Sequence, residues 1–330
     1  MTLLDDHRVL IDGAGVWEAQ DLGHFEVTGP DAGAFVNRIV TIDMSKVPPG
    51  RFAHALLLRD DGSILERVTV YRFADRVMLL VDTMNREVVW QHIVALKQGN
   101  VRLRDITNDV GLVAVRGPAS LERVAIMLSP MPANPGDVIN ARLNTVGVFA
   151  ARATSDGPEG VDLFCRVADR LTLCETLRNV GILPVGTGAW ELLHTEWGIP
   201  HVGSGIDPTD TPVEAGLEHL VATDKGSSFP GEKAFKSRVR TGAIKQLIGF
   251  HVDGSRRPPI DALVRVGGFE VDRVRAVTWS PRIGVIGFTA VPTSATAPGT
   301  ALSIESDGSY WHGEVRARPF VSRDTPWGKG

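Results

Sequence analysis

Residues 190–234 hold a predicted helix, a loop rich in Gly and Pro, and the start of a second helix. At 3.6 residues per turn, one face of the first helix carries two indoles, an imidazole and an aliphatic side chain: Trp190, Trp197, His194 and Leu193. Gly198 then stands where a left-handed C-terminal cap needs glycine. The pattern predicts a short amphipathic helix that ends in a tight turn.

The loop after this helix leads directly into another helix N-terminus. Residues 207–212 read D-P-T-D-T-P, which local turns order more readily than a strand ladder. Glu214 follows Thr211 by three positions, the spacing of a capping box, and Pro212 falls at the first helical position. We therefore predict a helix that begins at Pro212.

The composition is that of an ordinary folded protein, and 330 residues are enough for two or three domains. The net charge of −4 indicates no nucleic-acid surface, and no apolar run reaches the roughly 18–20 residues that span a bilayer. The N-terminus lacks the apolar core of a signal peptide. Because Cys165 and Cys174 are the only cysteines, we expect a reducing, cytoplasmic compartment and two inert, buried thiols.

A strand, a Gly-Pro turn and a helix are predicted twice, over residues 23–39 and 111–126. The two turn glycines, Gly29 and Gly117, are 117 − 29 = 88 positions apart. This spacing favours an internal duplication. The alternative is that two unrelated strand-to-helix turns use the same dipeptide. Between the two units, residues 51–58 and 64–73 predict a β-hairpin with an Asp-Gly turn.

From residue 247 onward, short apolar segments between Gly, Pro and Asp turns predict a small antiparallel barrel or sandwich. The predicted strands cover residues 248–252, 262–266, 271–279, 285–291, 301–305 and 313–320. A domain boundary near 241–246 gives an α+β region and a C-terminal β domain. Their predicted ranges are 1–244, made of units of about 1–105 and 106–244, and 245–330.

Several motifs occur in order along nearly the whole chain. The principal runs are E-W-G-I-P-H-V-G-S-G-I-D-P-T-D-T-P-V-E-A-G-L from Glu196 and D-K-G-S-S-F-P-G-E-K-A from Asp224. Further landmarks are V-T-G-P-D-A from Val27, R-G-P-A from Arg116, V-D-L from Val161, V-T-W-S-P-R from Val277 and R-P-F from Arg318. Together they resemble the aminomethyltransferase family, the glycine-cleavage T-protein and its tetrahydrofolate-dependent relatives. The resemblance implies an α+β fold of two related units, a C-terminal β-barrel and folate in a central channel.

Asp162 is the first candidate for binding that folate. Residues 161–167 alternate, so Asp162 and Phe164 share one face of a strand whose other face is apolar. Carboxylates are rarely buried without a partner, and a pterin offers one through a ring N–H beside an exocyclic amine. In the family an acidic residue, usually Glu, holds the pterin at this position. The alternative is an aspartate on an edge strand that faces water.

Four further positions are implied as folate contacts by the resemblance. Arg116 and Val115 belong to the second Gly-Pro landmark. His194 stands where the family commonly has Arg, and an imidazole is not a conservative replacement for a guanidinium. It could equally be a core histidine. Val202 replaces the tyrosine of the family's Tyr-Gly step, so a phenol that would line the pocket is missing.

The largest departure from the family concerns catalysis. The segment L-L-V-D-T-M-N-R-E-V-V-W from Leu79 resembles the family pattern V-N-A-x-N-x-x-x-D, whose final Asp acts as acid and base. That position is Val89, and an aliphatic side chain cannot accept a proton. Either another carboxylate substitutes, such as Asp82 or Glu87, or the chemistry differs. Glu87 could instead be a solvated charge, and Asp82 a helix cap.

The sequence therefore predicts a tetrahydrofolate-dependent transferase of methyl or aminomethyl groups. The missing aspartate favours a demethylase-type member over a true glycine-cleavage T-protein. His194, Asp82 and His54, in that order, are the candidate proton donors. The predicted partner is a small methylated or aminomethyl donor, with no metal, nucleic acid or membrane. Two alternatives stay open: a folate-binding scaffold without catalysis, and a detached module of a larger amine-oxidising enzyme.

Overall fold

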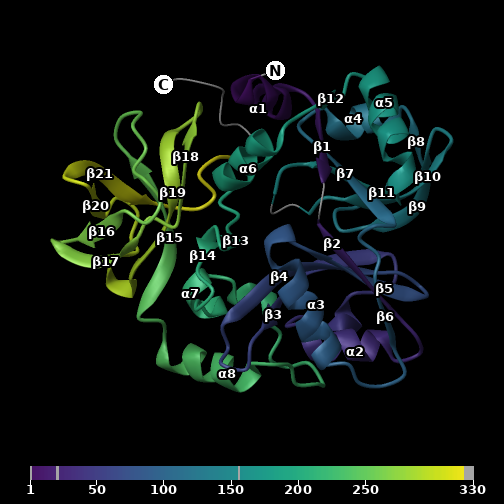
Figure 1. Ribbon diagram of the computed structural model, residues 1–330, viewed down its shortest axis with the longest axis horizontal. Helices are drawn as coiled ribbons and strands as arrows, with labels where there is room; N and C mark the ends of the chain where they lie inside the picture. The colour runs from purple at the N-terminus through teal and green to yellow at the C-terminus, as the bar shows by residue number, and fades with distance from the viewer. Residues whose placement is uncertain (1, 20–21, 155–156, 323–330) are drawn as a thin grey trace. The chain divides into compact units, whose positions relative to one another are not determined.

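The computed structural model describes residues 2–19, 22–154 and 157–322 (Figure 1). The chain forms two compact units, and each is assembled from three segments that alternate along the sequence. Unit 1 contains Met1–Leu58, Leu65–Trp190 and Leu220–Pro230. Unit 2 contains Arg59–Ile64, Glu191–His219 and Gly231–Gly330. The division falls inside helix α6 (Thr187–Glu196), the first helix that the aromatic pattern predicts.

The first sheet of unit 1 has five strands. In spatial order they are β3 (Arg51–Leu58), β4 (Ile64–Arg72), β5 (Arg76–Val81), β2 (Gly23–Thr28) and β6 (Arg102–Asp105). Helices α2 (Ala32–Ile39) and α3 (Arg86–Ala95) cover one face through buried side chains such as Phe35, Val36, Val89 and Ile93. The predicted hairpin is confirmed, because β3 and β4 are neighbours in this sheet.

The second sheet of unit 1 has seven strands. In spatial order they are β12 (Leu183–Pro184), β1 (Gly15–Ala19), β7 (Val110–Arg116), β11 (Gly160–Arg166), β10 (Val146–Arg152), β9 (Val138–Leu143) and β8 (Leu128–Ser129). The helices near it in sequence are α1 (Leu3–Asp12), α4 (Ser120–Ala125) and α5 (Arg170–Asn179). Val124 of α4 and Leu173 and Leu177 of α5 pack into its core.

The alternation predicted for β11 separates two cores. Val161, Leu163 and Cys165 belong to the core beneath α4 and α5. Phe164 belongs to a different cluster, built from both sheets, that includes Tyr71 of β4. We call this cluster the inner face of unit 1. Unit 1 is therefore layered, with the helices on the outer sides of two sheets that share an apolar interior.

The two Gly-Pro turns have the same backbone geometry. Gly29 and Gly117 both follow a strand and precede a helix, with φ of +110° and +123°. A Cβ at Gly29 would lie 2.4 Å from the carbonyl oxygen of Asn100, and one at Gly117 would lie 2.4 Å from that of Gly13. Only glycine permits this approach. The match supports the predicted duplication, while the boundaries of its units stay a prediction.

Unit 2 is built on one antiparallel sheet of seven strands. In spatial order they are β17 (Phe269–Arg273), β16 (Leu263–Val266), β20 (Ala301–Ser306), β21 (Ser309–Arg316), β15 (Lys245–Val252), β19 (Gly284–Pro292) and β18 (Ala276–Ser280). This order has two ends, so the predicted barrel is seen as a curled antiparallel sheet. The predicted single strand 271–279 is wrong, because β17 and β18 are separate strands on either side of Val274 and Arg275.

The segment between α6 and this sheet folds as its turn signals predict. Gly198 has φ of +68°, and the N–H of Ile199 reaches back to the carbonyl of His194 at 3.0 Å. The elements that follow are β13 (His201–Val202), β14 (Gly205–Ile206), α7 (Pro212–Ala215) and α8 (Glu232–Thr241). Helix α7 begins with the predicted capping box, in which Thr211 N and Oγ1 both donate to Glu214 at 2.9 Å.

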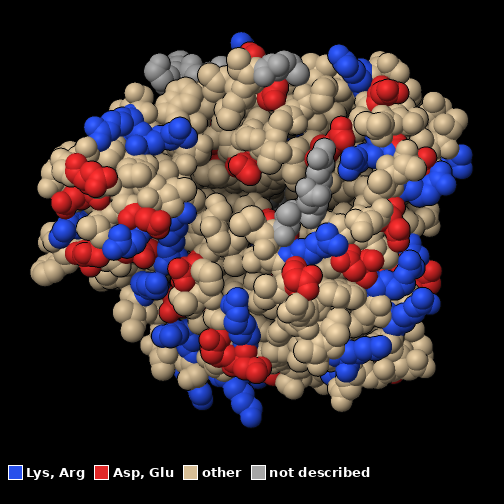
Figure 2. Space-filling view, viewed as in Figure 1, with Lys and Arg blue, Asp and Glu red and all other residues tan. Residues whose placement is uncertain are grey.

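Five short 3-10 turns complete the elements that the structure gives for its described residues. They are η1 (Met44–Lys46), η2 (Thr83–Asn85), η3 (Val167–Asp169), η4 (Glu218–Leu220) and η5 (Thr293–Ala295). On the face shown in Figure 2, acidic and basic side chains are interspersed. Among the described residues, no helix is long and apolar enough to cross a membrane.

The K-G-S-S-F-P-G-E run is tied to unit 1 by its lysine. Lys225 is buried, and its Nζ donates to the backbone carbonyls of Asn37, Val40 and Ile42, the last at 3.2 Å. The carbonyls of Asn37 and Val40 lie at the end of α2, where a helix leaves carbonyls without intrahelical donors, and that of Ile42 follows shortly after. The ammonium therefore caps a helix C-terminus, where a positive charge is favourable.

We expect Lys225→Met to lower the free energy of unfolding by about 3 kcal/mol, because buried carbonyls lose a charged donor. Urea unfolding followed by circular dichroism would measure the loss. Lys46→Met is the matched control, since the Lys46 side chain is 67% exposed. Equal stability of the two variants would contradict the assigned role of Lys225.

Candidate functional site

Asp162 lies in the middle of the seven-stranded sheet. Its strand, β11, has β7 and β10 on either side, and the residues directly opposite Asp162 are Ala114 and Ala151. The side chain is nearly buried, with 9% of the residue exposed. The alternative of an edge-strand aspartate facing water is therefore wrong. Because both cross-strand neighbours are alanines, little side-chain volume flanks the carboxylate within the sheet.

A pair of stacked indoles lies on the same face of the sheet as Asp162. Trp17 of β1 is opposite Ala114, so it stands two strands from Asp162 on the same face. The indole of Trp17 stacks on that of Trp190, with centroids 4.6 Å apart and planes at 18°. The guanidinium carbon of Arg116 lies 5.2 Å from the centroid of the Trp190 ring, within cation–π range.

Arg116 also neutralises Asp162. Its NH1 donates to Asp162 Oδ1 at 2.8 Å and to the carbonyl of Val115 at 3.0 Å. Both charged side chains are largely buried, at 11% and 12% exposed. Among the residues that the structure describes, the second oxygen of Asp162, Oδ2, has no hydrogen-bond partner. One carboxylate oxygen is thus held in place, and the other can accept a further donor.

Aromatic rings continue this site across the inner face. The ring of Tyr71 lies 4.9 Å from that of Phe164 and 5.0 Å from that of Phe52. Burial, and after it the negative charge of Asp162, raise the pKa of the Tyr71 hydroxyl well above its usual value. Tyr71 therefore keeps its proton and can donate it in a hydrogen bond.

His54 lies at the other end of this ring series. Its imidazole is 6.0 Å from the ring of Phe52. Nδ1 is 3.1 Å from the hydroxyl of Thr69, and Nε2 is 3.4 Å from that of Thr154. The structure thus brings the predicted residues Asp162, Arg116 and His54 to the inner face of one unit.

The remaining predicted residues have other surroundings. The Val115 side chain packs into the core beneath α4 and α5, so its contribution next to Asp162 is its carbonyl. Asp82 is half-buried and accepts from the N–H of Met84 at 3.2 Å, as a cap of the η2 turn would. His194 and Val202 belong to unit 2. His194 is half-buried, and its ring is 6.0 Å from that of His201, whereas Val202 is buried in β13.

The chain matches known proteins over most of its length. The family model described as the GCVT N-terminal domain matches residues 2–225. This chain belongs to the GCVT family. An aminomethyltransferase of Geobacillus sp. (strain WCH70) is 28% identical over 334 residues, which cover 98% of this chain and 91% of that protein. The aminomethyltransferase of Chlorobium limicola is 30% identical over 338 residues, 97% of this chain and 91% of that protein.

A solved structure shows the same fold. The glycine cleavage system aminomethyltransferase T from Bartonella henselae superimposes with a TM-score of 0.88 at 22% identity, over 99% of this chain and 91% of that one. The predicted aminomethyltransferase family is thereby confirmed, and so is the mixed α+β T-protein fold. The prediction of an enzyme that transfers one-carbon groups is confirmed at the level of the GCVT family.

Val89 is the residue that the sequence pattern predicts at the position of the family's catalytic aspartate. The side chain is fully buried, with 0% exposed, in the core that α3 forms with the five-stranded sheet. The substitute Glu87 is exposed on α3, and its Oε1 accepts from Gln91 at 2.8 Å, which fits a solvated charge.

The sequence analysis did not single out two buried carboxylates of unit 2. Glu196, fully buried at the end of α6, accepts from the Ser280 hydroxyl and from Arg282 NH1 at 3.0 Å. Ser280 and Arg282 belong to the W-S-P-R landmark, and this motif was the sequence signal that could have indicated a partner for Glu196. The second carboxylate, Asp210, is 1% exposed in the D-P-T-D-T-P loop.

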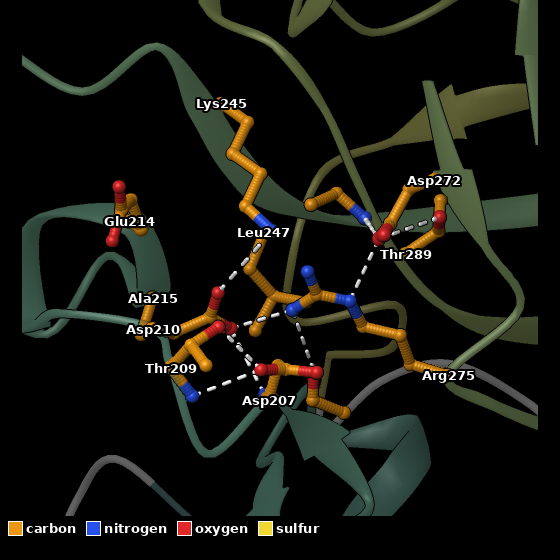
Figure 3. A network of polar contacts seen from close by, with 12 residues as sticks. Asp207, Thr209, Asp210, Glu214, Ala215, Lys245, Leu247, Asp272, Arg275 and Thr289 are labelled. Atoms are coloured by element: carbon orange, nitrogen blue, oxygen red, sulfur yellow. Dashed lines mark hydrogen bonds and ion pairs between the residues drawn. The ribbon is translucent and has the colours of Figure 1, made fainter. Parts of the chain in front are cut away.

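Figure 3 shows how Asp210 is held in unit 2. Arg275 NH1 donates to Asp210 Oδ2 at 2.5 Å, and Arg275 Nε donates to Asp272 at 2.7 Å. Lys245 Nζ is 3.8 Å from the other oxygen of Asp210. Arg275 lies between β17 and β18, and its pairing with Asp210 holds its side chain in the interior. The sequence does not reveal it because the partners are 65 positions apart.

The two cysteines add no further chemistry to the site. Cys165 is buried and Cys174 half-buried, and burial raises their thiol pKa values to about 11 and about 12. Both therefore stay protonated near neutral pH, as the inert role predicts. In the part of the chain that the structure describes, no group of three or more His, Cys, Asp or Glu could hold a metal ion.

We expect His24 to make the GCVT-family fold sensitive to acid. It is 2% exposed, its ring lies edge-on to that of Phe164, and burial lowers its pKa to about 4 from 6.5. Below pH 6.5, His24 takes up a proton in the unfolded chain, whereas in the folded chain it does so only near pH 4. Stability is therefore full above pH 6.5 and falls by about 3 kcal/mol as the pH drops to 4.

Urea titrations between pH 4 and 7 would measure this slope. His24→Leu should remove that part of it, whereas the exposed control His312→Leu should keep the wild-type profile. An unchanged slope in His24→Leu would show that other groups cause the acid sensitivity.

Proposed function

We propose that this chain is a tetrahydrofolate-dependent transferase of methyl groups, a demethylase-type member of the GCVT family. The observation that carries the proposal is Val89, an aliphatic side chain buried in an apolar core, where the sequence pattern predicts the family's acid/base aspartate. An aminomethyl donor reacts through a cationic iminium, which a carboxylate at that position would pair with. A methyl group moves by direct displacement and has no need of that pairing.

The residues around Asp162 fit a reduced pterin. The free Oδ2 accepts from an N–H beside an exocyclic amine, and the alanines on either side leave room for a flat ring. The stacked indoles of Trp17 and Trp190 offer an aromatic wall in the same row. Tetrahydrofolate, when bound, supplies the nucleophilic nitrogen N5 that receives the one-carbon unit. Arg116 holds the Asp162 carboxylate in a fixed orientation for it.

Asp162→Asn should weaken the binding of tetrahydrofolate by roughly 1–3 kcal/mol, because one charged acceptor becomes a neutral amide. Isothermal titration calorimetry measures the change. Asp169→Asn, which neutralises a partly exposed carboxylate paired with Arg166, is the matched control and should bind like wild type. Equal affinity of all three proteins would remove Asp162 from the pterin site.

We expect the purified protein to form 5-methyltetrahydrofolate from tetrahydrofolate and a methylated donor. The panel holds N-methylamines, S-methylsulfonium compounds and O-methyl aryl ethers, with an aminomethyl donor as comparison. Mass spectrometry separates the methyl product from the methylene-bridged product of aminomethyl transfer. Formation of the methylene product would restore the glycine-cleavage assignment. Tight folate binding with no product from any donor would favour the non-catalytic folate-binding protein.

A further inference from the structure

A cleft of about 440 Å³ lies in unit 1 between α2, the η1 turn and the loop that joins β4 to β5. This volume falls in the range of roughly 300–1,000 Å³ that small-molecule sites have. The lining includes Gly33 and Asn37 of α2, Met44 of η1, Arg72 at the end of β4, Phe73 of the loop and Arg76 of β5. Neither Asp162 nor the stacked indoles belong to the described residues that line it. The cleft is therefore distinct from the proposed folate site.

Arg72 is held in place at this cleft by one of its nitrogens. The side chain is half-buried, and NH1 donates to the carbonyl of Met44 at 2.6 Å and to that of Val47 at 2.7 Å. Among the residues that the structure describes, Nε and NH2 of Arg72 have no hydrogen-bond partner. These two nitrogens form one edge of the planar guanidinium, which matches two oxygens of a carboxylate or phosphate. Because the side chain is already anchored, binding through this edge costs little further conformational entropy.

The other charged residues of the lining have partners of opposite sign. Asp75, whose side chain is 72% exposed, accepts from Arg76 NH1 at 3.0 Å, and Arg76 Nε lies 3.6 Å from a carboxylate oxygen of Glu26. Arg72 forms no ion pair with any residue in the described part of the chain. The cleft therefore carries one positive charge that no described carboxylate neutralises.

The side of α2 that lines the cleft provides space. A Cβ added to Gly33 would meet no atom within 4 Å, so the volume beside this glycine is open. The amide of Asn37 is already engaged, because its Oδ1 accepts from Met44 N at 2.9 Å and its Nδ2 donates to Ser227 at 2.7 Å. Asn37 thus shapes the wall, and the guanidinium of Arg72 is the group with donors to offer. Gly33 is also a position where a side chain can be added without a clash.

We propose that this cleft binds a small organic anion and that Arg72 recognises its phosphate or carboxylate group. The edge formed by Nε and NH2 donates to two oxygens of the anion, while NH1 keeps its hydrogen bonds to Met44 and Val47. An anion is favoured over a neutral molecule of the same size, because only the anion replaces the water lost from the guanidinium with charged acceptors. The site gives this protein a ligand beyond those of the proposed one-carbon transfer.

The first test titrates the full-length protein with inorganic phosphate, pyrophosphate and succinate at constant ionic strength, by isothermal titration calorimetry. We expect saturable binding, and the anions that bind identify the recognised group as phosphate or carboxylate. Gly33→Glu should weaken binding by about tenfold or more, because a negative charge enters the cleft. The control Gly33→Ala should keep the wild-type affinity, and both variants should melt no lower than wild type, since each replaces a helical glycine. No saturable binding of any of the three anions, or equal affinity of the two variants, would overturn the proposal.

A second test locates the anion at Arg72. In protein labelled with ¹⁵N at arginine, the Nε signals of Arg72 and Arg316 are assigned from Arg72→Lys and Arg316→Lys. Addition of phosphate or succinate should move the Arg72 signal with the dissociation constant found by calorimetry. The signal of Arg316, a half-exposed arginine of unit 2 paired with Glu314, should stay in place. Excess tetrahydrofolate should leave the anion affinity unchanged. An Arg72 signal that does not move, or displacement of the anion by tetrahydrofolate, rejects this site even if the protein transfers methyl groups.

Discussion

A carboxylate buried in the middle of a sheet is costly unless a partner is buried with it. Arg116 and Asp162 meet this requirement at 2.8 Å on adjacent strands of unit 1. Removing two ions from water costs several kcal/mol each, so such a pair contributes little net stability. Its consequence is geometric, because the guanidinium fixes one carboxylate oxygen and leaves the other for a ligand. The proposed folate site uses that oxygen together with the flanking alanines and the stacked indoles.

The same physical rule organises the loops that connect the elements. Glu196 with Arg282, Asp210 with Arg275, and Lys225 with the carbonyls at the end of α2 each place a charge in the interior beside a specific partner. Each links a loop or helix end to a distant segment of its own unit. Apolar contacts alone would tolerate sliding, whereas a buried charge tolerates one partner geometry. These pairs therefore specify the paths of segments that have little regular structure.

Val89 is held by apolar packing and not by a buried charge pair. An aliphatic side chain there joins Ile93 and the strand valines in an unbroken core, so α3 packs as an ordinary amphipathic helix. At the start of this helix the side-chain amide of Asn85 donates to the carboxylate of Glu66, which belongs to β4.

Local signals in the sequence determined the local structure. The capping box at Thr211, the glycine at Gly198, the two Gly-Pro turns and the alternation around Asp162 depend on neighbours within a few positions, and each appears as predicted. The order of motifs likewise identified the family. The sequence could not reveal that Asp162 meets Arg116 or that Arg275 interrupts a predicted strand to reach Asp210. Those contacts join residues far apart in the chain, and only the packing of strands and helices selects one partner among many for each buried charge.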